Sequence, residues 1–152
     1  MDDAALIQGS EEWRLARVGS LGASRVADAI ARTKSGWGAS RKNLAAELVV
    51  ERLTGAPAPS FTNDAMRWGT ETEPQARDAY CFYRDADVME IGLIRHPTIK
   101  GTHASPDGLV SDDGMLEIKC PSSATHIDTL LSKSIADKYV VQMLWQMACT
   151  GR

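Results

Sequence analysis

The stretch from Ser105 to Pro121 places the tightest constraint on how this chain can fold. It contains two short, largely apolar segments on either side of an Asp-Asp-Gly sequence at residues 112–114. That sequence is typical of a hairpin turn, because glycine accepts a positive φ and aspartate bonds its own backbone. The pattern therefore predicts two antiparallel strands, over residues 105–110 and 115–121, around which the rest of the fold is organised.

Three charged side chains are expected to gather on one face of this hairpin. Asp107 begins the first strand, while Glu117 and Lys119 lie two residues apart in the second and so project from the same face. The opposite face is apolar and can pack into a core; it carries Leu116, Ile118 and Cys120. Two carboxylates, a backbone carbonyl and water suit a hard divalent cation such as Mg²⁺, and a nearby ammonium can orient a water nucleophile. The alternative is a surface hairpin with a solvated Glu/Lys pair.

Size and composition fit one domain, expected over residues 1–152. No apolar run is long enough to span a membrane, and the N-terminus lacks a signal-peptide pattern. The three widely spaced cysteines argue against a disulfide framework or a cysteine zinc site. We therefore expect a protein of the reducing cytoplasm.

Charge is unevenly distributed along the chain. The net charge is −3, yet the basic side chains of one early stretch are opposed only by Asp28; they are Arg14, Arg17, Arg25, Arg32, Lys34, Arg41 and Lys42. This distribution fits a protein that binds phosphate at one place and metal at another. A solvated basic face is the alternative.

Two short helices are expected early in the chain. The first begins at Ser10 and ends at Gly19, and the second opens at Gly22-Ala23-Ser24. The inward face of the second helix is expected to carry Val26, Ala27 and Ile30. A serine at a helix N-terminus beside Arg17 would form an anion site from a hydroxyl, free backbone N–H groups and a guanidinium. An ordinary helix cap is the alternative role for Ser24.

The later elements are predicted from hydrophobic periodicity and from start and stop signals. Helices are expected over residues 40–54, 63–83, 125–131 and 135–148, and a strand over residues 88–94. Ser40 is expected to cap the first of these helices, and Pro74 to kink or restart the second. Trp37 is expected to pack against its neighbours rather than stack on a base. The last helix is expected to carry one stripe of Tyr139, Met143 and Met147 (or Gln146), with Gln142 off it.

A resemblance to known nucleases begins at the hairpin. Pro106-Asp107 followed by Glu117-Ile118-Lys119 resembles the PD-(D/E)XK nuclease motif. The longer strings over residues 105–109 and 116–121 resemble the phage lambda exonuclease family, also called YqaJ-like viral recombinase nucleases. The resemblance implies an α/β fold with a restriction-endonuclease-like core, in which a mixed central β-sheet is flanked by α-helices. Family members continue further, so the chain is expected to be a compact version or to lack the C-terminal part of the family domain.

The resemblance also implies catalytic roles for the charged residues of the hairpin. Asp107 and Glu117 would bind metal directly, and the backbone carbonyl of Ile118 would be a further ligand. Lys119 would position and activate the water that attacks the phosphodiester.

Two more catalytic residues are expected outside the hairpin. The family has a glutamate after a Trp-Gly pair, which favours Glu73 over Glu71 as an acid that binds metal directly or through water. A surface glutamate at a helix start is the alternative. Gln142 would contact the catalytic water, and Gln146 is the alternative residue for this role.

A third implied group binds the 5′-phosphate of the DNA end. Arg17, Ser24 and Ser105 fall on the matching positions. The family also uses an arginine shortly after the E-x-K segment, where this chain has Thr125. His103 is given no role at this stage.

The function implied is a Mg²⁺-dependent 5′→3′ exonuclease that acts on double-stranded DNA ends and releases 5′-mononucleotides in phage-type homologous recombination. Two metal ions are expected, with Mn²⁺ as the alternative metal. The resemblance further implies a homotrimeric ring, a single-strand-annealing protein as partner, no association with a membrane, and a phage or bacterial host cytoplasm. The alternatives are another PD-(D/E)XK endonuclease or repair nuclease, or a non-catalytic module that binds DNA ends and assembles other proteins.

Overall fold

The computed structural model describes residues 2–59 and 62–152. Its internal contacts divide the chain into two compact units. The first comprises Met1–Pro59, Ile91–Pro106 and Asp137–Arg152, and the second comprises Ser60–Glu90 and Asp107–Ala136. Each unit contains a three-stranded sheet of its own. The single nuclease domain expected over the whole chain stays a prediction.

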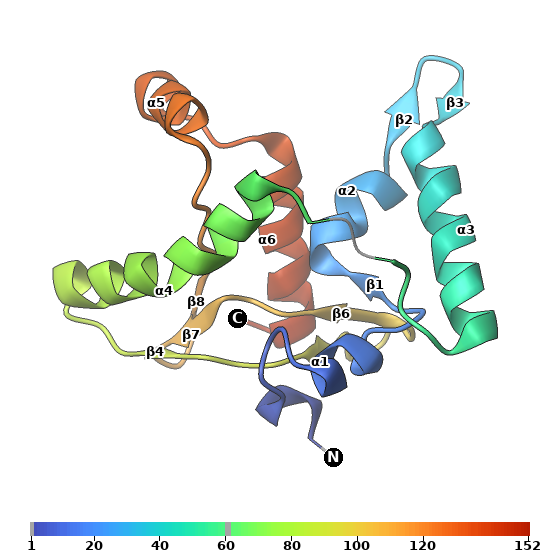
Figure 1. Cartoon of the computed structure of the whole chain (residues 1–152), viewed down its shortest axis with the longest axis horizontal. Helices are drawn as coiled ribbons and strands as arrows, with labels where there is room; N and C mark the ends of the chain where they lie inside the picture. The colour runs from blue at the N-terminus through green and yellow to red at the C-terminus, as the bar shows by residue number, and fades with distance from the viewer. Residues whose placement is uncertain (1, 60–61) are drawn as a thin grey trace. The chain divides into compact units, whose positions relative to one another are not determined.

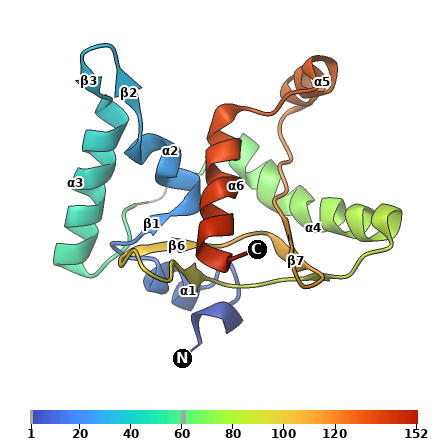
Figure 2. The ribbon, with the colours of Figure 1, turned by 180° about the vertical axis from the view of Figure 1, so that it is seen from behind.

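The sheet of the first unit is mixed, with β6 at its centre. β1 (Leu21–Gly22) runs parallel to β6 (Thr102–Ala104), and β5 (Ile94–Arg95) pairs with β6 in the antiparallel sense. All of β6 is buried, and the helix α6 (Asp137–Thr150) packs against it (Figures 1 and 2). The core at this contact consists of Ala23, Ala104 and Cys149, with Ile94 and Trp145 packed against them.

The first unit also contains helical segments of different lengths that precede α4 in the chain. They are η1 (Asp3–Ala5), α1 (Glu11–Ala16), η2 (Ala23–Arg25), α2 (Val26–Ala29) and α3 (Ala39–Thr54). α1 begins as predicted, because the Ser10 hydroxyl accepts a hydrogen bond from the Trp13 backbone N–H at 3.1 Å. The predicted Ser40 cap of α3 is wrong, since Gly38 holds the N-cap position. The inward placement of Ile30 is also wrong, because this side chain is exposed beyond the short α2.

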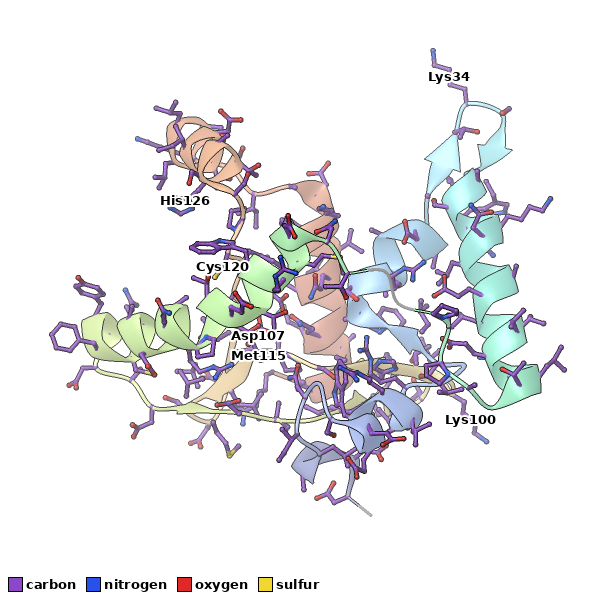
Figure 3. The ribbon with its side chains drawn as sticks, viewed as in Figure 1. Lys34, Lys100, Asp107, Met115, Cys120 and His126 are labelled. Carbon is purple, nitrogen blue, oxygen red and sulfur yellow. The ribbon has the colours of Figure 1, made fainter. Side chains whose placement is uncertain are left out.

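Trp37 lies in a small hairpin of β2 (Arg32–Thr33) and β3 (Gly36–Trp37). Lys34 lies at its tip (Figure 3). Trp37 is 52% exposed, and the guanidinium carbons of Arg32 and Arg41 lie 3.9 and 3.8 Å from the centroid of its ring. The side chain contacts its neighbours, as predicted. These neighbours are arginine side chains at the surface and not residues of a core.

The second unit contains α4 (Asp64–Arg84), α5 (Ser123–Ser132) and an antiparallel sheet. The strands of that sheet are β4 (Val88–Met89), β7 (Gly108–Val110) and β8 (Gly114–Leu116), with β7 in the middle. α4 runs through Pro74 without interruption, so of the two predicted alternatives the second helix start is wrong, and the kink stays a prediction. Gly108 is required where β4 meets β7, because a Cβ there would lie 2.1 Å from a methyl carbon of Val88.

All three predicted strands are shorter than expected. The first strand of the hairpin, expected over residues 105–110, begins only at Gly108. The second strand of the hairpin ends at Leu116, so that residues 117–121 continue as extended coil rather than strand. The strand predicted over residues 88–94 is split into β4 and β5. Between them, the N–H groups of Gly92 and Leu93 donate to the carbonyls of Ala4 and Asp3, each at 2.9 Å. These hydrogen bonds to η1 replace sheet pairing at this point.

The stripe predicted for the last helix is wrong at Met147 but right with its alternative Gln146, since Tyr139 and Met143 are half-buried and Gln146 is buried. The residues of α6 that are buried are Gln142, Gln146 and Cys149, whereas Met147 is exposed. Hydrophobicity alone pointed to the methionine face because it ranks glutamine as a surface residue. The core of the first unit therefore has a strongly polar border along α6.

Candidate active site

Asp107 lies at the open end of the β7–β8 hairpin, immediately before β7 (Figure 3). Its backbone N–H donates to the carbonyl of Leu116 at 3.1 Å, and its Oδ2 accepts from the backbone N–H of Ile118 at 2.6 Å. The second bond takes the place of a ladder hydrogen bond beyond the end of β8. The carboxylate is thereby fixed against the segment that carries Glu117 and Lys119.

Glu117 and Lys119 are brought together as predicted, although through coil geometry and not through a strand. The Lys119 ammonium donates to Oε1 of Glu117 in a close ion pair. The Glu117 side chain is only 5% exposed, whereas that of Lys119 is 38% exposed. A buried carboxylate thus holds a half-exposed ammonium beside Asp107. The solvated Glu/Lys pair considered from the sequence does not describe this arrangement.

Glu73 lies on α4 in the same unit and is half-buried, whereas Glu71 is exposed. Arg77, one turn further on, donates to Glu73 at 2.7 Å and to Glu90 at 2.8 Å. α4 approaches the E-x-K segment closely at Gly69, where a Cβ would lie 3.9 Å from the carbonyl oxygen of Cys120. Of the two glutamates considered from the sequence, Glu73 is the one whose charge acts on the pKa of Asp107.

Electrostatics shows that these acids act on one another. Burial first, and then the carboxylates of Glu117 and Glu73, raise the pKa of Asp107 to about 7, against the opposing effects of the Ile118 N–H and Lys119. Burial, followed by Glu73 and Asp107, also raises the pKa of the Cys120 thiol. A local excess of buried negative charge is the condition that a divalent cation would relieve.

The residues fit a cation that keeps much of its water. No group of three or more His, Cys, Asp or Glu side chains among residues 2–59 and 62–152 is arranged to hold a metal ion. Mg²⁺ is commonly bound by one or two carboxylates and several waters, a donor set that Asp107 and Glu117 can supply. The contact seen from Ile118 to Asp107 is its N–H, and its carbonyl as a metal ligand stays a prediction.

The residues expected at the 5′-phosphate lie in the first unit. Arg17 follows α1, and its guanidinium carbon lies 3.9 Å from the centroid of the Trp13 ring. The indole N–H of Trp13 donates in turn to the hydroxyl of Ser105 at 3.2 Å. Arg17 and Ser105 are thus brought together through Trp13. Ser24 is exposed in η2, one residue after the element begins, with Gly22 and not the serine at the N-cap.

One residue near this group was missed from the sequence. His103 is buried at 2% exposure, and its Nε2 accepts a hydrogen bond from Nε of Arg17 at 3.2 Å. It lies two residues before Ser105 in an extended segment, so both side chains project from the same face. That spacing was the signal available in the sequence.

The structure shows where the remaining predicted residues lie but does not test their roles. Gln142 and Gln146 are both buried in α6 of the first unit, and contact of either with a catalytic water stays a prediction. Thr125 is exposed in α5 of the second unit, where its hydroxyl lies 3.2 Å from that of Ser122.

Among the described residues, no helix combines the length and apolar character needed to cross a membrane.

Comparison with solved structures defines the class of protein. The fold matches two crystal structures of LHK-Exo, an alkaline exonuclease from Laribacter hongkongensis, one of them in complex with dAMP. In each case the TM-score is 0.86 and the sequence identity 52%, over 94% of this chain and 70% of the LHK-Exo chain. The predicted mixed α/β nuclease fold and the predicted exonuclease class are confirmed.

The family is identified by comparing the sequence with models of protein families. The YqaJ-like viral recombinase domain matches residues 12–152, and the chain belongs to this family, as predicted. A search of curated proteins found no match.

Proposed function

We propose that this protein is a Mg²⁺-dependent exonuclease that degrades double-stranded DNA from its ends in the 5′→3′ direction, releasing 5′-mononucleotides in phage-type recombination. The observation that carries the proposal is the convergence of Asp107, Glu117 and Lys119 at the end of one hairpin, with Asp107 electrostatically coupled to Glu73. Family membership and the likeness to an alkaline exonuclease crystallised with dAMP support the choice of reaction and polymer.

The acids would hold the metal. Asp107 and Glu117 are proposed as direct ligands together with the Ile118 carbonyl, and Glu73 as a ligand directly or through water. Mn²⁺ would fit the same oxygen donors, and two ions are proposed, each of which would keep several of its waters. When bound, the metal would supply positive charge against the phosphoryl oxygens of the transition state.

Lys119 would position the attacking water. Its ammonium can only donate hydrogen bonds, and its ion pair with the buried Glu117 fixes the nitrogen beside the acids. From there it would donate to the water oxygen and favour the deprotonated form of that water. Gln142 is proposed as a second contact to the same water.

Arg17, Ser24 and Ser105 would bind the terminal 5′-phosphate, which sets the polarity of digestion. A guanidinium supplies fixed donors that match a phosphate group, and the hydroxyls add further hydrogen bonds. A homotrimer and a single-strand-annealing protein as partner complete the proposal and rest on family membership.

The experiment compares linear and circular duplex DNA as substrates, with Mg²⁺ and then with chelator. We expect loss of linear DNA alone, dependent on metal, and no detectable digestion by Lys119→Ala. Lys100→Ala is the matched control, since Lys100 is exposed in a loop of the first unit. Equal digestion by Lys119→Ala and wild type would remove the catalytic assignment. Cleavage of circular DNA would indicate an endonuclease, and end binding without digestion would indicate a non-catalytic module.

A further inference from the structure

His103 occupies the centre of the first unit's sheet, where a polar ring is unusual. It lies on β6, paired with Gly22 of β1 on one side and Arg95 of β5 on the other. Its side chain is among the few that are almost completely buried. A buried imidazole requires hydrogen-bond partners at both nitrogens, and the structure supplies them.

The two partners fix which nitrogen carries the proton. Nε of Arg17 lies 3.2 Å from Nε2, and the hydroxyl of Ser20 lies 2.8 Å from Nδ1. Arginine has no acceptor, so Nε2 must accept from it, and the ring proton must therefore reside on Nδ1 and be donated to Ser20. Arg95 donates to the same Ser20 hydroxyl at 3.4 Å.

The imidazole remains neutral across the working pH range. Burial, with the adjacent charges of Arg17 and Arg95, lowers the pKa of His103 to about 3, while Asp3 acts weakly in the opposite direction. The acceptor that faces Arg17 is consequently present at every pH at which the protein would act.

The Arg17 side chain is held on two sides. Trp13 lies under the guanidinium plane, and His103 accepts its Nε–H. Gly22 leaves the space for this approach, because a Cβ there would lie 3.0 Å from Nε2 of His103 and 3.6 Å from an Nη atom of Arg17. With Nε engaged, the fork of Nη donors is the part of the guanidinium that can address a ligand.

We propose that His103 is a positioning residue for recognition of the DNA end: it orients Arg17 so that the two Nη groups face a 5′-phosphate. The inference rests on the proposed role of Arg17 in end binding and adds the residue that holds it in place. His103 itself does not touch the phosphate.

The test measures binding in chelator, so that it is independent of catalysis. Duplexes with a 5′-phosphate and with a 5′-hydroxyl are compared by fluorescence anisotropy. We expect the wild type to prefer the phosphorylated end, and His103→Leu to lose about tenfold of this preference, since a charge-assisted hydrogen bond of this kind contributes at that level. His103→Gln, whose amide oxygen can accept from Arg17, should restore most of it. The control is His126→Leu, because His126 is exposed in α5 of the second unit.

A spectroscopic measurement on the unmodified protein covers the case in which His103→Leu does not fold. Nitrogen-15 chemical shifts should report a neutral His103 with its proton on Nδ1 at pH 7. A proton on Nε2, a charged ring, or an unchanged phosphate preference in folded His103→Leu would overturn the inference. Equal binding of both ends by the wild type would overturn it as well. An inactive protein that still prefers phosphorylated ends would overturn only the exonuclease function.

Discussion

The acids at the hairpin predict that Asp107→Asn inactivates the protein and stabilises it at the same time. Asparagine keeps an oxygen for the N–H of Ile118, a bond of 2.6 Å, but removes the negative charge. The fold disfavours the ionised carboxylate of Asp107, first because it is buried and then because it lies near Glu117 and Glu73. Without metal, the charge is a cost that only function explains.

The magnitude follows from linkage between protonation and folding. The pKa of Asp107 is raised from 3.8 to about 7, so the folded chain binds this proton more tightly than the unfolded chain. Stability from the neutral carboxyl is present below about pH 4 and is lost as the pH rises to about 7. With roughly 1.4 kcal/mol per unit of pKa, the wild type loses up to about 4 kcal/mol over this range.

Chemical denaturation of both proteins in chelator, at pH 4.5 and pH 8, measures the effect. Asp107→Asn should be the more stable protein at pH 8, and the difference should shrink markedly at pH 4.5. Added Mg²⁺ should raise the stability of the wild type and leave the variant unchanged, since a ligand that binds only the folded state stabilises it. Asp112→Asn, in the exposed turn of the hairpin, is the control without a pH-dependent difference.

A difference in unfolding free energy that stayed the same at both pH values would refute the reasoning. It would mean that Asp107 does not sense a buried cluster of like charges. A variant less stable than the wild type at pH 8 would have the same consequence.

Three further predictions concern other parts of the chain. Arg17→Ala should reduce the rate on 5′-phosphorylated ends to that on 5′-hydroxyl ends, measured side by side; equal discrimination by variant and wild type would contradict its assignment. His103 should lower the stability of the wild type as the pH falls below 6.5, opposite in sign to the effect of Asp107, because its lowered pKa leaves the proton on the unfolded chain only; the difference in unfolding free energy between His103→Gln and the wild type should change with pH over this range. Gly92→Ala should cost about 3 kcal/mol or more in thermal unfolding, since its Cβ would lie 2.3 Å from the carbonyl oxygen of Leu6. Gly55→Ala, with a φ of 68° and open space around it, should cost only about 1 kcal/mol.

The sequence was sufficient to predict which charged residues converge, but not by what geometry. Spacing in a strand placed Glu117 and Lys119 on one face, yet β8 ends before them at Leu116. The Ile118 N–H that a further strand residue would give to the ladder is taken by the Asp107 carboxylate instead. Local pattern cannot register this competition, because a side chain 11 residues away decides it.

The buried polar residues were harder to predict for a related reason. Gln142 and Gln146 face the core of the first unit, although any hydrophobicity scale assigns them to the surface. His103 was given no role because a lone histidine carries little information. Its partner Arg17 is 86 positions away in the chain and is joined to it only when β6 and the end of α1 come together. Whether a polar side chain is buried depends on such distant partners. Buried apolar side chains, in contrast, recur in the sequence with the period of the helix or strand that carries them.

The two candidate sites follow one electrostatic principle with opposite signs. In the second unit, burial and neighbouring acids oppose the charge on Asp107; in the first, burial lowers the pKa of Arg17, with only a partial offset from Glu51. Burial makes the charged form of such a group unfavourable, because the group loses its hydration. A ligand of the opposite charge compensates for this lost hydration and so stabilises the charged form. The acids would therefore favour a cation and the Arg17 group an anion. The proposed metal ion and DNA phosphate would meet these two requirements, which is the combination that a phosphodiesterase acting at DNA ends needs.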